Sequence, residues 1–422
     1  MGLPQGWQTP KTDWTAFDVL TAAALNRIEG NIRAIEEGIR TINDNSLPTS
    51  NTVPLSTFID NVASLIKAIT GKSSWRQPPS VNLEAFAGLD RFPDFEMLRR
   101  WQYHCLAAHT KFERITTLSL TGVAKFSGAV MANYWIVFIP NSASYVMLWS
   151  PKTGETKTID VILGSNKWRG AAVVGNKVFC APYDAENILV IDVSEYTVSY
   201  LSHPDVGTTS GKFWGAVAKD KKVYFIPHNA ITVLYYDTET QNFGTIGNLT
   251  GNAKWAGGAL AVERIFCAPY DSASVLIIDT TNNTVSTTGS LAGSGKCIGA
   301  AANPWETFVV FAPFNHNVVR TINTSTLAIS GPSISASSQV SAGIIPLANG
   351  GFVCVPYNHS KFIYVTPDLG TATEIDTGLT ASAKYMGGCL YLDGTVYFAP
   401  YDETYPGRTF AVKDYTVYDA RI

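Results

Sequence analysis

The spacing of apolar residues differs between two parts of the chain. From about residue 115 onward, short apolar runs that end in proline alternate with polar turns, whereas the first 114 residues place apolar side chains three and four positions apart. Short apolar runs bounded by turns are typical of strands, and the three-four spacing is typical of helices. We therefore expect a helical N-terminal part and an all-β C-terminal part.

The β part is an internal repeat. An apolar run ending in proline recurs at Pro140, Pro182, Pro227, Pro269, Pro313, Pro356 and Pro400, which are 42, 45, 42, 44, 43 and 44 residues apart. A second motif keeps the same period: lysine, usually an aromatic residue, any residue and glycine, as in Lys167-Trp168-Arg169-Gly170. The sixth copy departs from this motif. Each copy contains four strand-like segments, which together predict a seven-bladed β-propeller with four-stranded blades, because one blade cannot bury its own faces.

Closure of the ring requires the first and last blades to share a sheet, since an unpaired blade exposes a strand edge. Residues 115–122 resemble an outer strand. We expect them to complete the last blade beside the C-terminal residues 417–422.

The six cysteines are widely spaced and contain no Cys-x-x-Cys pair. Cys180, Cys267 and Cys354 each stand two residues before the proline of their repeat, where other blades carry phenylalanine. One core position per blade predicts buried, unpaired thiols. His316 and His359 fall in different repeats and His203 is isolated, so we expect no metal site.

The first predicted helix has an apolar seam with alternating steps of three and four. Its positions are Leu25, Ile28, Ile32, Ile35, Ile39 and Ile42. The seam predicts a coiled coil, and isoleucine at both kinds of seam position favours three or more strands. An ordinary amphipathic helix against a local core is the alternative. Further helices are expected at 58–69 and 94–112.

We divide the chain accordingly into an attachment and coiled-coil helix at 1–45, a jointed helical linker at 46–114, and the propeller at 115–422. The segment Pro10-Lys11-Thr12-Asp13-Trp14-Thr15, followed by Leu25-Asn26-Arg27-Ile28-Glu29-Gly30-Asn31-Ile32, resembles the start of minor tail and baseplate proteins. Such proteins belong to phages and phage-tail-like particles of Gram-positive bacteria. The Pro-Tyr-Asp and Pro-Tyr-Asn repeats separately resemble bacterial and phage propeller repeats.

In the tail and baseplate family this segment attaches the protein to the particle, and distal domains contact the host surface. The resemblance implies other tail or baseplate proteins as partners. It also implies a place in the virion or tail-like particle after synthesis in the host cytoplasm.

Composition excludes several classes of function. The chain has 422 residues and a formal net charge of −3, so its charge gives no general attraction to nucleic acid. No apolar stretch approaches the roughly 18–20 residues of a membrane helix, and we expect no membrane insertion. The sequence lacks the Gly-x-Ser-x-Gly, His-Glu-x-x-His and phosphate-loop motifs, so we assign no catalytic residue and no cofactor.

Both repeat motifs fall on connections that leave one face of the predicted disc. Aromatic rings beside short amide and carboxylate groups suit sugars, whose C–H faces pack on rings while their hydroxyls need polar partners. The candidate ligand-binding residues are Arg169, Tyr183, Asp184, Trp214, His228, Asn229, Tyr270, Asp271, Asn315, His316, Tyr357, Asn358, His359, Tyr401 and Asp402. A structural role, with Lys254 reaching Asp271 for example, explains the repeated Lys, Tyr and Asp or Asn residues without a ligand and is the favoured interpretation for them.

These features predict a non-enzymatic tail-fibre or baseplate receptor-binding protein. Its N-terminal helices form a homotrimer and attach to the particle, while its propeller binds a host cell-surface polysaccharide. A purely structural collar or spacer is one alternative. A glycan-cleaving depolymerase with two facing carboxylates, such as Asp184 and Asp402, is the other.

Overall fold

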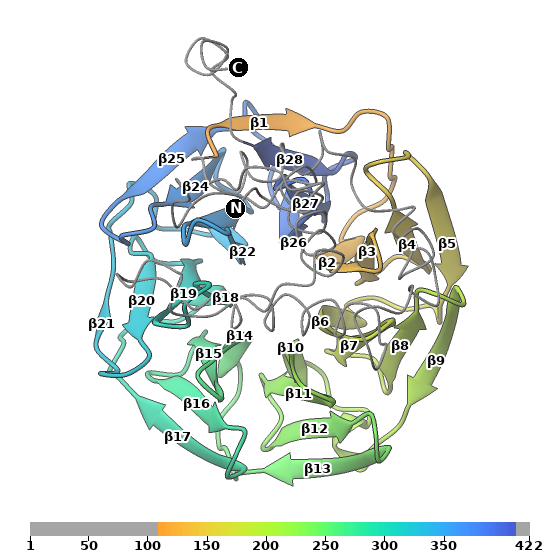
Figure 1. Ribbon diagram of the computed structural model, residues 1–422, viewed down its shortest axis with the longest axis vertical. Helices are drawn as coiled ribbons and strands as arrows, with labels where there is room; N and C mark the ends of the chain where they lie inside the picture. Colours follow the sequence, from red (N-terminus) through yellow and green to blue (C-terminus); the bar gives the residue numbers. More distant parts are fainter. Residues whose placement is uncertain (1–108, 411–422) are drawn as a thin grey trace, which may run out of the picture. The chain divides into compact units, whose positions relative to one another are not determined.

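The computed structural model describes residues 109–410. The attachment segment, the predicted coiled-coil seam and the C-terminal residues 417–422 lie outside the described residues. Within them the chain forms seven antiparallel four-stranded sheets arranged around a central axis (Figure 1). The predicted seven-bladed propeller with four-stranded blades is therefore confirmed.

The strands of each blade follow one another from the axis outwards. Blade 1 contains β2 (Phe126–Ala132), β3 (Trp135–Pro140), β4 (Tyr145–Trp149) and β5 (Thr156–Asp160). Blade 2 contains β6 (Trp168–Val174), β7 (Lys177–Pro182), β8 (Ile188–Asp192) and β9 (Thr197–Leu201). The short 3-10 helix η3 (Pro204–Val206) leads to blade 3, with β10 (Phe213–Lys219), β11 (Lys222–Pro227), β12 (Val233–Asp237) and β13 (Asn242–Ile246).

The remaining blades repeat this order. Blade 4 contains β14 (Trp255–Ala261), β15 (Arg264–Pro269), β16 (Val275–Asp279) and β17 (Thr284–Thr288). Blade 5 contains β18 (Cys297–Ala302), β19 (Phe308–Pro313), β20 (Arg320–Asn323) and β21 (Ile329–Ser330). Blade 6 contains β22 (Ser341–Pro346), β23 (Phe352–Pro356), β24 (Lys361–Val365) and β25 (Ala372–Asp376). Blade 7 contains β26 (Tyr385–Leu390), β27 (Val396–Pro400), β28 (Gly407–Phe410) and β1 (Lys111–Arg114).

The hydrophobic core lies between neighbouring blades rather than inside any one of them. Along β3, Val137 and Ile139 pack toward blade 2, whereas Ile136 and Phe138 pack toward blade 7. The second strand of each blade, counted from the axis, is buried on both faces and must therefore be apolar throughout. This explains the continuous apolar run before each proline. Outer strands alternate instead, and β5 follows an exposed-intermediate pattern along its length.

The strand that closes the ring is not the one predicted. Its residues are β1, Lys111–Arg114, which pairs antiparallel with β28, whereas residues 115–122 form no strand. Leu118 and Leu120 are buried in the core between blades 7 and 1 instead. The helix predicted at 94–112 is also wrong at its end, because its last two residues begin β1. In Figure 1, β1 lies on the outside of β28 although the two are at opposite ends of the described chain.

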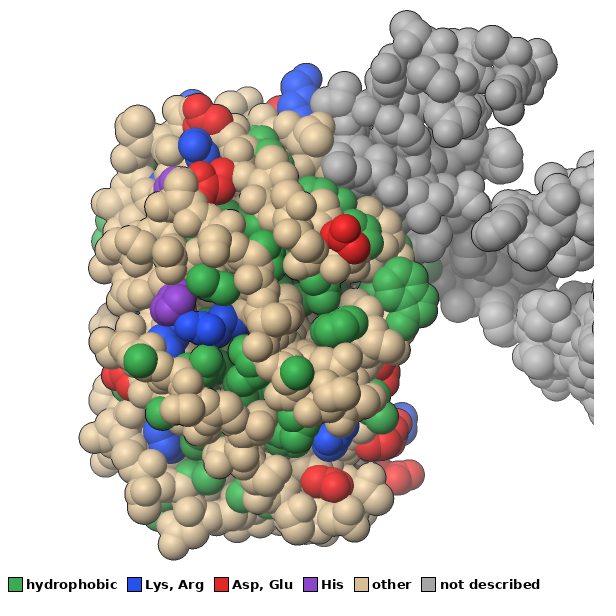
Figure 2. Space-filling model, turned by 90° about the vertical axis from the view of Figure 1, so that its left-hand side faces the viewer, with side chains coloured by type: hydrophobic (Ala, Val, Ile, Leu, Met, Phe, Trp, Pro, Cys, Tyr) green, Lys and Arg blue, Asp and Glu red, His purple; other side chains and the backbone are tan. Residues whose placement is uncertain are grey.

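The predicted buried cysteines are confirmed. Cys180, Cys267 and Cys354 are fully buried and unpaired, each in a different core cluster, and burial raises the pKa of their thiols. On the side of the disc shown in Figure 2, charged side chains of both signs are scattered among polar and apolar ones. Among the described residues, we find no helix with the length and apolarity that a transmembrane span requires.

Candidate functional site

A circular belt of backbone hydrogen bonds builds one face of the disc. In blade 2, the N–H of Tyr183 donates to Lys167 O at 2.8 Å, and Tyr183 O accepts from Lys212 N of blade 3 at 2.9 Å. The same two bonds recur at every junction between neighbouring blades, which we call a blade seam. At the seam that closes the ring, Tyr401 O of blade 7 accepts from Lys125 N of blade 1 at 3.0 Å. The belt therefore brings both sequence motifs to one face.

The residue after each aromatic position fastens its blade to the next. Asp271 Oδ1 accepts from Gly295 N at 2.7 Å, and Asn229 Oδ1 accepts from Ala253 N at 2.7 Å. The donor residue has a positive φ at every seam, as in Ala253 at +49°. A side-chain acceptor thus holds an otherwise unfavourable left-handed backbone in place. This contact gives the repeated Asp and Asn residues a structural role.

The repeated lysines are structural as well, but their partners differ from the one we considered. Lys254 is 4% exposed and its Nζ donates to the carbonyl oxygen of Gly251 at 2.7 Å, three residues earlier, rather than to Asp271. Burial lowers the pKa of Lys254 to about 8. Lys125, Lys167, Lys212, Lys296 and Lys384 make the same contact.

A ring of seven glycines narrows the axis. A Cβ on Gly257 would lie 2.9 Å from the Cα of Gly299, and one on Gly387 would lie 2.8 Å from the Cα of Gly128. All seven glycines have positive φ, and each sits at a register shift between the first two strands of its blade. Only glycine permits both this backbone conformation and such close approach.

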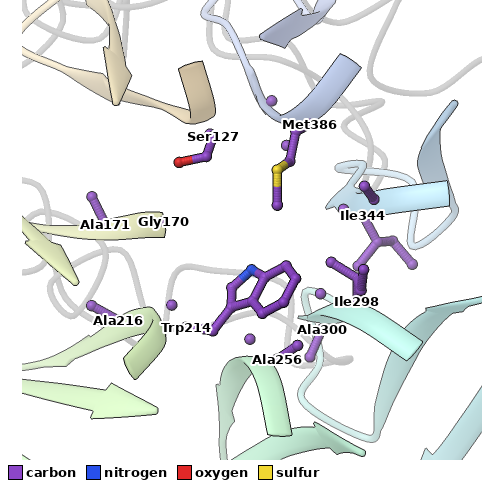
Figure 3. A pocket seen from close by; sticks show the side chains of 18 of the residues that line it. Ser127, Gly170, Ala171, Trp214, Ala216, Ala256, Ile298, Ala300, Ile344 and Met386 are labelled. Carbon is purple, nitrogen blue, oxygen red and sulfur yellow. The ribbon is translucent and has the colours of Figure 1, made fainter. Parts of the chain in front are cut away.

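The glycine ring lines an axial cavity of about 210 Å³. Trp214, Ile298 and Met386, from the position before the glycine, project into its centre (Figure 3). The other four blades place Ser127, Arg169, Ala256 and Ala342 at this position. The bulky side chains make a mostly apolar plug at the end of the axis where the innermost strands begin.

Aromatic side chains surround the plug in a nearly continuous ring. Trp214 lies 5.5 Å from Tyr183 and 5.7 Å from Tyr270 between ring centroids. The ring continues through Phe314 and Tyr357 to Tyr401, with centroid distances of 6.2, 5.7 and 6.0 Å. Blade 1 breaks it, because the position after Pro140 is Asn141.

The tyrosines of this ring are half-buried. Burial raises the pKa of Tyr357 to about 12 and also raises that of Tyr270 and Tyr401, so all three are neutral phenols at physiological pH. Among the described residues, we find no hydrogen-bond partner for the hydroxyls of Tyr183, Tyr270 and Tyr357. These hydroxyls are thus available to a ligand as donors and acceptors.

Arg169 places a positive charge inside the aromatic ring. Its guanidinium carbon lies 3.8 Å from the centroid of Tyr183 and 4.4 Å from that of Trp214, within the range of cation–π attraction. One terminal nitrogen of Arg169 donates to Asn166 Oδ1 at 3.2 Å. Within residues 109–410 its Nε is buried and has no hydrogen-bond partner.

His228 takes the aromatic position of blade 3. Its Nδ1 donates to Trp255 O at 3.0 Å, and its ring lies 5.1 Å from Trp214 and 5.4 Å from Tyr270 between centroids. The pKa of His228 is lowered to about 4, chiefly by burial; the hydrogen bond to Trp255 O partly opposes this, and the nearby charge of Arg169 adds to the lowering. His228 is therefore a neutral member of the aromatic ring at physiological pH.

The structure divides the sequence-predicted candidates into two groups. Arg169, Tyr183, Trp214, His228, Tyr270, Tyr357 and Tyr401 come together around the axis. The acidic and amide candidates Asp184, Asn229, Asp271, Asn315, Asn358 and Asp402 fasten neighbouring blades.

His316 and His359 stand apart from the aromatic ring. His316 Nε2 lies 2.8 Å from a terminal nitrogen of Arg320, and His359 Nε2 lies 3.8 Å from Glu374 Oε2 on outer strand β25. In the described part of the chain, no three His, Cys, Asp or Glu side chains gather as metal ligands. The sequence analysis did not identify Asn141 and Ser127, which interrupt the aromatic ring in blade 1. Their alignment in the repeat with Tyr183 and Arg169 is the signal that could have identified them.

Comparison with known proteins shows the fold alone. No family model and no curated protein matches the chain. The similar solved structures include a streptogramin B lyase, with a TM-score of 0.62 and 16% identity over 74% of this chain and 99% of that one. They also include a catalytically inactive virginiamycin B lyase from Staphylococcus aureus with quinupristin, with a TM-score of 0.62 and 13% identity over 72% of this chain and 99% of that one.

The WD40 repeats of RRP9 are similar as well, with a TM-score of 0.55 and 10% identity over 72% of this chain and 100% of that one. The fold is thus shared by lyases and by a WD40 repeat protein. Function must accordingly be argued from the site itself.

The carboxylates of the face already have a structural role. The carboxylates considered as a hydrolytic pair are already engaged: Asp184 Oδ1 accepts from Ser210 Oγ and Gly211 N at 2.6 and 2.8 Å, and Asp402 Oδ1 accepts from Ala124 N at 2.6 Å. The aromatic faces, the phenol hydroxyls, one guanidinium and the second oxygens of these carboxylates remain for a ligand.

Proposed function

We propose that the chain is a non-catalytic component of a phage tail or phage-tail-like particle, and that its propeller binds a host cell-surface glycan. The ring of aromatic side chains around Arg169 is the observation that carries the binding proposal. Rings supply flat apolar surfaces for the C–H faces of sugars, and the phenol hydroxyls and the guanidinium supply polar partners. The N-terminal resemblance supports attachment to the particle.

The proposed N-terminal trimer makes weak sites sufficient. A stem that carries three propellers, present in several copies on one particle, allows many weak contacts at once. After the first propeller binds, binding of the others is intramolecular, so the overall affinity exceeds that of one propeller without any new contact. A single propeller that binds a glycan with a Kd of about 1 mM is therefore consistent with firm attachment of the particle.

Binding is tested with the full chain and purified surface polysaccharide from susceptible bacteria. We expect Tyr270→Leu to weaken binding severalfold, because leucine keeps the apolar contact with the plug but removes the ring and its hydroxyl. The matched control is Tyr200→Leu, which removes a tyrosine from outer strand β9, where Tyr200 stacks on Trp168.

Three outcomes separate the competing roles. Loss of binding in Tyr270→Leu but not in Tyr200→Leu supports a receptor-binding face. Absence of binding to any susceptible surface rejects it and leaves a collar or spacer. Shortening of the polysaccharide chains during incubation contradicts the non-catalytic role, and substitution of Asp184 or Asp402 then tests the depolymerase alternative.

The trimer is tested separately by the solution mass of the full chain. The monomer mass is 45.7 kDa, so we expect a species of three times that mass. Substitution of Ile32 and Ile35 by aspartate puts charges into the predicted seam and should give monomers. Monomeric wild-type chain contradicts the trimer without affecting the binding proposal.

A further inference from the structure

We infer that Arg169 binds an anionic group, a phosphate or a carboxylate, carried by the ligand of this face. For the glycan, this inference rests on the proposed function and narrows it to acidic surface polymers. The anion site itself is carried by the position, the contacts and the surroundings of one side chain.

Arg169 stands where every other blade has an uncharged residue. The position before the axial glycine holds serine, tryptophan, alanine, isoleucine, alanine and methionine in the other six blades. Burial next to an apolar plug disfavours a charge unless a partner stabilises it. An arginine at this one position therefore places an otherwise costly charge at the centre of the face.

The neighbours orient the guanidinium but do not neutralise it. Tyr183 and Trp214 contact it through their rings, and the Asn166 side-chain oxygen is a neutral acceptor. Among the described residues, no carboxylate forms an ion pair with Arg169. One terminal nitrogen of the guanidinium donates to Asn166, and the other has no hydrogen-bond partner among the described residues, so it remains to donate to an oxygen of a carboxylate or phosphate.

The other charges at the blade seams are of both signs. The carboxylates of Asp184, Asp271 and Asp402 each accept a backbone N–H at a blade seam. Six buried lysines lie at the same seams, with their Nζ groups bonded to neutral carbonyl oxygens. Asp184, Glu186, Asp271, Asp402 and Glu403 lie near these lysines, so the two signs largely offset each other, whereas the guanidinium of Arg169 forms no ion pair among the described residues.

The gap in the aromatic ring lies next to Arg169, because the side chains of Asn141 and Arg169 both donate to Asn166 Oδ1. Blade 1 contributes Asn141 and Ser127 next to blade 2, where each of the other blades contributes an aromatic ring and four of them contribute a bulkier side chain than serine. The seven-fold repeat is therefore broken on the side of Arg169. An acidic sugar can pack on the rings of blades 3 to 7 while its charged group meets the guanidinium.

The test uses the full chain at constant ionic strength. The polymer probes are poly(glycerol phosphate), polygalacturonate and neutral dextran, and the small probes are inorganic phosphate and acetate. We expect Arg169→Gln to weaken binding of an acidic polymer roughly tenfold or more, as loss of a charge-assisted hydrogen bond implies. Lys152→Gln is the matched control, because it removes the same charge from an exposed turn outside the aromatic ring.

Two further variants keep the result interpretable. Thermal unfolding shows whether Arg169→Gln retains the fold, and Arg169→Lys keeps the charge while losing the planar fork. We expect Arg169→Lys to bind less tightly than wild type and more tightly than Arg169→Gln. The phosphate-bearing and carboxylate-bearing polymers, compared side by side, identify which source of the anion fits.

Failure of the anion site and failure of the glycan proposal give different results. Equal binding of acidic polymers by wild type and Arg169→Gln, or equal binding of dextran and acidic polymers, overturns the anion site and leaves glycan binding intact. Binding of phosphate or acetate that depends on Arg169, without binding of any polymer, supports the anion site and rejects the glycan. Absence of all binding overturns both.

Discussion

Asp402 Oδ1 accepts a hydrogen bond of 2.6 Å from the N–H of Ala124, although the two residues are 278 positions apart. The same contact joins neighbouring blades elsewhere in the ring, as between Asp271 and Gly295. The seam that closes the propeller is thus fastened on this face as the internal seams are. Each such contact also holds one residue with positive φ, such as Ala124 at +49°.

The seam contact predicts a clear ranking of variants. Asp402→Ala leaves the N–H of Ala124 without its acceptor and should lower the free energy of unfolding by about 1–3 kcal/mol. Asp402→Asn keeps an oxygen acceptor, as Asn229 and Asn358 do in other blades, and should stay within about 0.5 kcal/mol of wild type. Urea unfolding measures both, and equal stability of the two variants would contradict the seam role.

In the glycine ring, we expect a clash with the neighbouring backbone to lower the free energy of unfolding more than the positive φ of the substituted residue does. Gly257→Ala puts a Cβ 2.9 Å from the Cα of Gly299 and should cost more than about 3 kcal/mol, since backbone must move in the next blade. Gly175→Ala is the control, because Gly175 has a φ of +60° and nothing lies within 4 Å of its added Cβ. It should cost about 1 kcal/mol. Comparable losses in urea unfolding would show that φ alone sets the cost.

The number and order of blades could be predicted because proline ends a strand buried on both faces. That strand has to be apolar throughout, so its sequence keeps the same appearance in every blade. The closing strand has no such signature: Lys111–Arg114 is an outer strand, with two charged ends and partial burial. Residues 115–122 are more apolar and therefore resemble a strand, but Leu118 and Leu120 are apolar because they fill the core between blades 7 and 1.

The sequence predicts that the candidate residues share one face of the disc, but it does not predict which side chains contact one another there. The repeat aligns Tyr183, His228 and Tyr270, so their common location follows from the topology. The partner of Lys254 does not, because its carbonyl acceptor is presented by a left-handed turn that sequence does not specify. The contact of Arg169 with Trp214 likewise depends on how far each side chain reaches across the axis.

The closing strand predicts where a propeller fragment must begin. A fragment of residues 109–422 contains β1, whereas one of residues 115–422 lacks it and leaves β28 as an unpaired edge. The shorter fragment also loses Phe112, whose ring centroid lies 6.1 Å from that of Tyr385 and 6.3 Å from that of Phe398. We expect it to be less stable by about 3 kcal/mol or more, and more prone to aggregate.

Urea unfolding and light scattering compare the two fragments. The variant Phe112→Ala in the longer fragment separates ring packing from strand pairing, since it keeps the backbone of β1. Its loss of stability should be smaller than that of the shorter fragment. Equal stability of all three proteins would show that β1 does not close the ring.

Buried His228 predicts a loss of stability in acid. Its pKa is lowered by burial from 6.5 to about 4, so between these values the unfolded chain binds a proton that the folded chain does not. Stability must then fall as the pH decreases from about 6.5 to about 4, by up to roughly 3 kcal/mol, and this contribution is constant outside that window. His228→Phe introduces the residue that Phe314 supplies in blade 5 and removes the titrating group. The difference in unfolding free energy between wild type and His228→Phe should therefore shift in favour of the variant between pH 7.5 and pH 4.5. A difference that is the same at both pH values would show that His228 is protonated as readily in the folded propeller as in the unfolded chain.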